Sequence, residues 1–165
     1  MKAVYVDTNV LVAYCSADKT EEAKKEQVRN ALAVFAQLKD VRLCVSLWAI
    51  TEMVKVLVAN KKMDRGDVAE IESQLANERR LNDLKIDLIE VSPREGYDFA
   101  EFFFHVRQGI LTYRSGVGDI IHNVIMKNNG ITMILTFDEK NDFKQIPGLT
   151  VLHPRDVKLP PESKK

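Results

Sequence analysis

Four acidic residues stand at points where an apolar pattern in the sequence begins or ends. Asp7 and Asp138 follow short apolar runs that predict buried strands, whereas Glu52 and Asp119 lie near the starts of apolar helical patterns. In a parallel sheet, ligands bind outside the carboxyl ends of the strands. We therefore expect these four carboxylates to gather at one rim of a sheet.

A cluster of ionised carboxylates requires a positive charge or added protons. Two unit charges about 4 Å apart repel by about 4 kcal/mol at an effective dielectric near 20. A set of carboxylate oxygens suits Mg²⁺ or Mn²⁺, and such ions typically serve phosphodiester hydrolysis. Zinc fits poorly, because the two cysteines lie in apolar runs and the three histidines, His105, His122 and His153, have no ligand spacing.

The elements that must position these acids alternate along the chain. Strands are predicted at Ala3–Val6, Val41–Val45, Ile86–Val91, Ile131–Leu135 and Thr150–Leu152. Helices are predicted at Glu21–Leu38, from a Ser46 cap to Leu57, at Arg94–Arg107 and at Ile120–Met126, with one or two surface helices in Met63–Leu84 and a loop at Gly109–Gly118. This alternation predicts an α/β fold in three layers, with helices on both faces of a short, mostly parallel sheet of four or five strands.

Composition narrows the class of protein. The chain has 165 residues, which suits one domain, expected at 1–154 with a helical insertion at about 63–85 and a polar tail at 155–165. Its formal net charge is zero, so any contact with nucleic acid must be local. No apolar run approaches the roughly 18 residues that a membrane span needs. Cys15 and Cys44 offer no disulfide framework, which favours a reducing cytoplasm.

The ordered motifs of the chain resemble those of a known family. They are Val6-Asp7-Thr8-Asn9, Glu52, Gly118-Asp119, Thr136-Phe137-Asp138 through Asp142-Phe143, and Ile146-Pro147-Gly148-Leu149. Over about residues 3 to 153 they resemble PIN domains, and a chain of this size is similar to VapC-type ribonuclease toxins of toxin–antitoxin pairs. The resemblance implies cleavage of RNA that depends on Mg²⁺ or Mn²⁺.

The resemblance also implies roles for the four acids. Asp7, Glu52 and Asp119 would form the acidic triad that binds the metal and catalyses cleavage, and Asp138 would take the fourth position. A metal-activated water would then attack the phosphodiester in line.

Five further residues are expected to support this site. By resemblance, Asn9 and Thr136 would orient the carboxylates through hydrogen bonds, and Asp142 would assist them. Arg114 and Lys140 lie near the expected rim, where either could hold an RNA phosphate.

The sequence leaves partners and some functional classes open. The helix around Tyr97 and Phe104 is apolar on two sides, which favours a homodimer, and an antitoxin protein is a possible partner. A phosphotransfer domain is disfavoured, because it usually has a second acid where Thr8-Asn9 stands. The chain could also be an RNA-processing nuclease outside any toxin–antitoxin system, or an inactive scaffold that binds RNA or protein.

Overall fold

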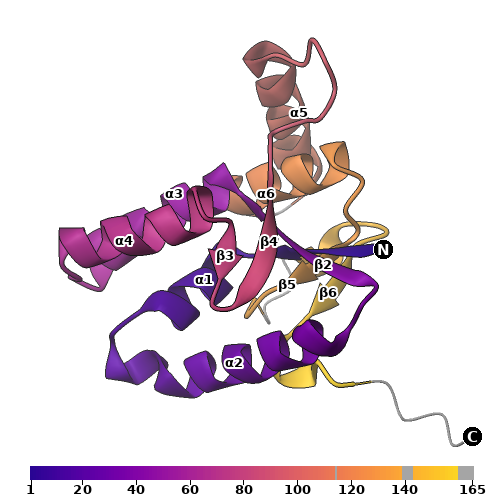
Figure 1. The fold of residues 1–165 in the computed structure, drawn as a ribbon. Helices are drawn as coiled ribbons and strands as arrows, with labels where there is room; N and C mark the ends of the chain where they lie inside the picture. The colour runs from indigo at the N-terminus through magenta and orange to yellow at the C-terminus, as the bar shows by residue number, and fades with distance from the viewer. Residues whose placement is uncertain (114, 139–142, 160–165) are drawn as a thin grey trace, which may run out of the picture.

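The strands of the protein pair into one central sheet, drawn in the middle of Figure 1. The structure is a computed structural model and describes residues 1–113, 115–138 and 143–159. Within these residues the sheet has six strands in the order β3-β4-β2-β1-β5-β6. They are β1 Lys2–Val6, β2 Val41–Ser46, β3 Arg80–Leu81, β4 Leu84–Ile89, β5 Met133–Leu135 and β6 Thr150–Leu152.

All pairings except one are parallel, so the expected α/β fold is confirmed. β1 pairs with both β2 and β5, while β3 alone runs antiparallel to β4. The sheet has more strands than predicted because Arg80–Leu81, expected within a helical region, forms a tight hairpin with β4. Two residues are too few to show a period in the sequence, but Asn82 in the connecting turn adopts the left-handed φ of 56° that such hairpins need.

Helices cover the sheet. In Figure 1, α2 runs along one side and α6 along the other, and α5 extends beyond α6, away from the sheet. The helices are α1 Thr8–Cys15, α2 Glu22–Gln37, α3 Leu47–Lys55, α4 Arg65–Ala76, α5 Phe99–Thr112 and α6 Val117–Asn128; a π-helical turn, Val56–Asn60, continues α3. Short 3₁₀ turns occupy Lys19–Glu21, Phe143–Gln145 and Pro154–Asp156.

Helix α5 is displaced along the sequence from its prediction. It begins after Asp98, whose side chain accepts a hydrogen bond from Glu101 N at 2.8 Å, and it continues to Thr112 through residues expected to form a loop. The glycine that suggested a loop, Gly109, lies inside the helix. A Cβ there would come within 2.6 Å of Ile120 Cγ2, so glycine is what allows α5 to pack closely on α6.

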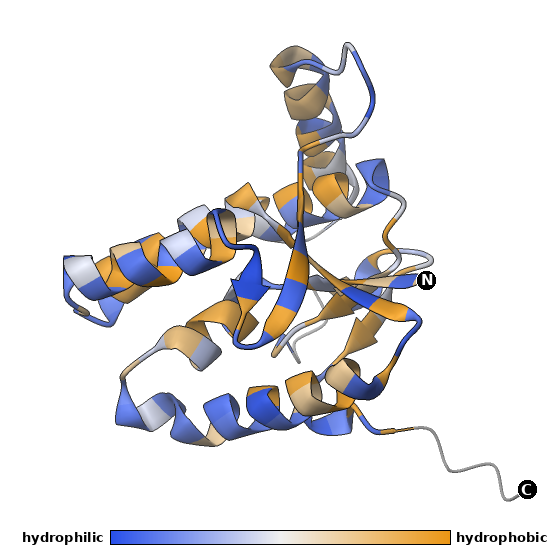
Figure 2. Ribbon diagram, in the orientation of Figure 1, coloured by the Kyte–Doolittle hydropathy of each residue, from blue (hydrophilic) through white to orange (hydrophobic). Residues whose placement is uncertain are grey.

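Apolar residues of the central strands and of the helices packed on them form the core, and both kinds of element carry orange segments in Figure 2. The central strands β1 and β2 are buried on both faces towards their carboxyl ends. Outside this core, α5 exposes several large apolar side chains, Phe99, Phe103, Phe104 and Leu111. No helix in the described ranges is both long and apolar enough to cross a lipid bilayer.

Candidate acidic site at the strand ends

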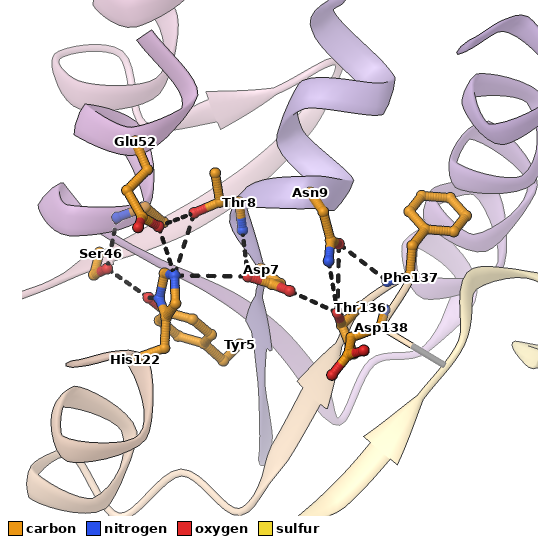
Figure 3. A network of polar contacts seen from close by, with 11 residues as sticks. Tyr5, Asp7, Thr8, Asn9, Ser46, Glu52, His122, Thr136, Phe137 and Asp138 are labelled. Carbon is orange, nitrogen blue, oxygen red and sulfur yellow. Dashed lines mark hydrogen bonds and ion pairs between the residues drawn. The ribbon is translucent and has the colours of Figure 1, made fainter. Parts of the chain in front are cut away.

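Asp7 lies where β1 ends and α1 begins. Its backbone N–H donates to Leu135 O at 3.0 Å, which extends the pairing with β5 by one residue. Its carboxylate Oδ1 accepts from Thr8 N at 2.7 Å as the cap of α1, and Oδ2 accepts from Thr136 Oγ1 at 2.6 Å. Only 4% of the residue is exposed. Asp7 is therefore a helix cap and also a buried carboxylate held at both oxygens (Figure 3).

Glu52 comes from α3, the helix that follows β2. As expected, Ser46 caps this helix, since its Oγ accepts from Ala49 N at 3.1 Å. Glu52 Oε2 accepts a hydrogen bond from Thr8 Oγ1 at 2.7 Å. Glu52 is therefore directed towards Thr8, the residue that follows Asp7.

The centre of the site is a residue to which the sequence motifs assign no role. His122 on α6 is almost fully buried, and its Nε2 lies 2.8 Å from Glu52 Oε2 and 3.6 Å from Asp7 Oδ1. Its Nδ1 lies 2.7 Å from Tyr5 Oη, which in turn lies 2.6 Å from Ser46 Oγ. Figure 3 shows the ring between the two carboxylates and the two hydroxyls.

The sequence does carry a signal for His122. The spacing of the histidines relative to one another, which fits zinc poorly, does not reveal it. His122 instead stands three residues after Asp119 in an apolar helix, and residues three apart share one helix face.

Asp119 and Asp138 approach the same rim from two further elements. Asp119 is in the first turn of α6, and that turn lies against Glu52, because a Cβ on Gly118 would come within 2.9 Å of Glu52 Oε1. The backbone N–H of Asp138 donates at 3.0 Å to the Thr136 hydroxyl that binds Asp7. Asp7 and Glu52 therefore share His122, and the other two acids adjoin the same network through their neighbours.

The supporting residues connect the ends of β1 and β5. Asn9 Nδ2 donates to Thr136 Oγ1 at 3.0 Å, and Asn9 Oδ1 accepts from Phe137 N at 3.0 Å. These contacts fix the Thr136 hydroxyl so that it donates to Asp7. The remaining predicted residues, Arg114, Lys140 and Asp142, lie outside the described residues.

The pKa values of the two carboxylates beside His122 shift in opposite directions. Burial raises the pKa of Asp7, and the opposing effects of His122, Thr136 and Thr8 do not cancel it. Burial also raises the pKa of Glu52, but the hydrogen bonds from His122 and Thr8 outweigh it, so that this pKa is lowered. Glu52 is thus an ionised carboxylate that accepts hydrogen bonds. The contacts of Asp7, by contrast, do not fully compensate the cost of burying its negative charge.

The donor set suits a hard cation, although the side chains do not yet enclose one. In the described part of the chain, no three His, Cys, Asp or Glu side chains are grouped closely enough to hold an ion as they stand. Each oxygen of Asp7 accepts one hydrogen bond and so keeps a further lone pair. A buried carboxylate with free lone pairs and unfavourable ionisation fits Mg²⁺ or Mn²⁺.

A family model confirms the resemblance that the motifs suggested. The model of the PIN domain matches residues 4–149, and the chain belongs to the PIN domain family. No curated protein sequence matches the chain significantly.

Solved structures with the same fold include three described as VapC or VapBC proteins. Rickettsia felis VapBC2, bound to a DNA fragment from its promoter, has a TM-score of 0.61 at 15% identity, covering 92% of this chain and 98% of that chain. VapBC-1 from nontypeable Haemophilus influenzae has a TM-score of 0.62 at 14% identity, with the same coverages of 92% and 98%. Mycobacterium tuberculosis VapC20, described as a Sarcin-Ricin loop cleaving toxin, has a TM-score of 0.55 at 13% identity, covering 86% and 93%. At these identities the likeness establishes the fold.

Proposed function

We propose that the protein is an endoribonuclease that depends on a divalent metal ion and acts as a VapC-like toxin. The observation that carries this proposal is the convergence of Asp7 and Glu52, 45 sequence positions apart, on the single ring nitrogen of His122 inside a PIN fold. Separate elements supply these carboxylates, and their proximity has a stability cost that a cation would remove.

In this proposal Asp7, Glu52, Asp119 and Asp138 hold Mg²⁺ or Mn²⁺. The bound ion would polarise a phosphoryl oxygen and supply an activated water. The residues of the protein would hold the carboxylates in position before the ion binds. Thr136 does this for Asp7, because its hydroxyl donates to Asp7 Oδ2 while it accepts from Asn9 Nδ2.

The proposed partners are RNA as substrate, an antitoxin protein and a second copy of the chain. Two of the structures with the same fold are VapBC proteins, which supports an antitoxin. The exposed apolar side chains on α5, among them Phe99 and Leu111, support a homodimer in which a second copy covers that helix. Cys15 and Cys44 are free thiols, which suits activity in the cytoplasm.

Cleavage of single-stranded RNA with Mn²⁺ tests this function. We expect the wild-type protein to cleave and to stop when the metal is chelated. Glu52→Gln and Asp119→Asn should each lose at least about 100-fold in rate, because each removes an ionised ligand. Asp40→Asn, at an exposed carboxylate, is the matched control and should retain full activity. An inactive wild-type protein that binds Mn²⁺ poorly would indicate a scaffold, and full activity in Asp119→Asn would remove that residue from the site.

A further inference from the structure

His122 is a buried polar side chain in an otherwise apolar stretch of helix. Its neighbours Ile120, Ile121, Val124 and Ile125 are all buried. A buried imidazole without partners costs several kcal/mol in an apolar environment, so its nitrogens need hydrogen bonds. Both nitrogens have them, and each bond leads to a different part of the site.

The hydrogen positions in this network follow from Glu52. An ionised carboxylate only accepts hydrogen bonds, so His122 Nε2 carries the proton and donates to Glu52 Oε2. On the other side of the ring, Nδ1 is hydrogen-bonded to Tyr5 Oη at 2.7 Å, and Tyr5 Oη is hydrogen-bonded to Ser46 Oγ at 2.6 Å. Ser46 accepts in turn from Ala49 N.

The two oxygens of Glu52 consequently have different surroundings. Oε2 accepts hydrogen bonds from both Thr8 Oγ1 and His122 Nε2. Oε1 lies against Gly118, the residue before Asp119. A carboxylate held at one oxygen cannot rotate freely, so the other oxygen keeps its direction.

We propose that His122 is a positioning residue for the metal site: held from behind by the hydroxyls of Tyr5 and Ser46, it fixes Glu52 Oε2 and so directs Oε1 towards Asp119, where a divalent cation would be shared. This inference rests on the proposed function and deepens it. The imidazole is only 2% exposed, whereas the Glu52 side chain is 26% exposed, so the carboxylate lies between the ring and solvent. This order of burial suits a residue that acts through the carboxylate.

Titration of the RNA-free protein with Mn²⁺ by calorimetry tests the role directly. His122→Leu removes both hydrogen bonds, and we expect Mn²⁺ affinity to fall by about 10- to 100-fold, the usual effect of removing a partner that orients a ligand. His122→Gln keeps an N–H that can reach Glu52, and we expect it to bind within about threefold of wild type. Tyr5→Phe removes the hydrogen bond to His122 Nδ1, and its Mn²⁺ affinity should lie between those of His122→Leu and His122→Gln. The matched control His105→Leu, on α5, should bind as wild type.

A second pair of variants keeps the test valid if His122→Leu does not fold. His122→Asn retains an amide near the position of Nδ1 but is too short to donate to Glu52, so it should bind Mn²⁺ more weakly than His122→Gln. Equal affinities in Asn and Gln, or a folded His122→Leu with wild-type affinity, would overturn the inference while leaving the nuclease proposal intact. A wild-type protein that neither binds Mn²⁺ nor cleaves RNA would overturn both.

Discussion

Asp7→Asn should stabilise the protein when no metal is present. The substitution removes a charge from a residue that is 4% exposed and that shares His122 with ionised Glu52. The hydrogen bonds to Asp7 can rearrange, because the Thr136 hydroxyl has a second acceptor in Asn9 Oδ1 at 3.4 Å. The change therefore removes a buried charge, and the Thr136 hydroxyl keeps an acceptor.

The size of the effect follows from the same contacts. Burial is the largest cause of the raised pKa of Asp7, and repulsion by Glu52 is a smaller one. The imidazole between them and the hydrogen bonds to Asp7 offset much of this, and we expect a net gain of about 1–2 kcal/mol. For a chain of this length, the melting temperature should rise by about 2–8 °C.

Thermal melting followed by circular dichroism in the presence of a chelator measures the gain, with Asp40→Asn as the control. The pKa of Asp7 is raised in the fold above its ordinary value of 3.8, so the cost of ionising it appears as pH rises above that value. The advantage of Asp7→Asn should therefore be present at neutral pH and absent at about pH 3. Added Mn²⁺ should raise the melting temperature of the wild-type protein only. A folded Asp7→Asn that melts at or below the wild type in chelator at neutral pH would refute this reasoning.

Two other changes separate stability from metal binding. Lys61→Met removes ion pairs of 2.9 and 2.7 Å to Asp18 and Glu21, and should lower the melting temperature at neutral pH by about 1–3 °C. The backbone hydrogen bond from Thr20 and then Lys61 lower the pKa of Asp18 to about 2, and Lys61 also lowers the pKa of Glu21. The difference should therefore fade as acid protonates both carboxylates, and melting curves that keep the gap below about pH 2 would contradict this expectation. Gly118→Ala places a Cβ 2.9 Å from Glu52 Oε1 near the start of α6, so calorimetry should show weaker Mn²⁺ binding while melting shows equal or greater stability, since alanine favours the helix. Unchanged Mn²⁺ affinity would show that Oε1 does not face the ion.

The sequence was informative wherever a signal was local. The strand before Asp7 and the Ser46 cap of α3 were predicted because burial and capping act within a few residues. The start of α5 was misplaced because the aromatic pattern begins before Asp98, the residue that caps the helix. Gly109 was misjudged because its reason, the approach of α6, lies in another helix.

The candidate site shows more clearly that local sequence signals do not predict long-range contacts. The approach of Asp7 and Glu52 to one edge follows from the parallel pairing of β1 and β2, because both residues come after the carboxyl ends of these strands. His122 could not be placed in the same way, because its partners Tyr5 and Glu52 stand 117 and 70 positions away. The spacing of three from Asp119 places His122 on the same helix face, but which residues it contacts depends on packing between distant parts of the chain.

The sheet order also bears on when the proposed nuclease can act. β5 pairs with β1 but is made long after it, so a nascent chain that ends before residue 133 contains Asp7 without the Thr136 hydroxyl that holds it. The ribosome must therefore synthesise most of the polypeptide before the acidic site around Asp7 can assemble.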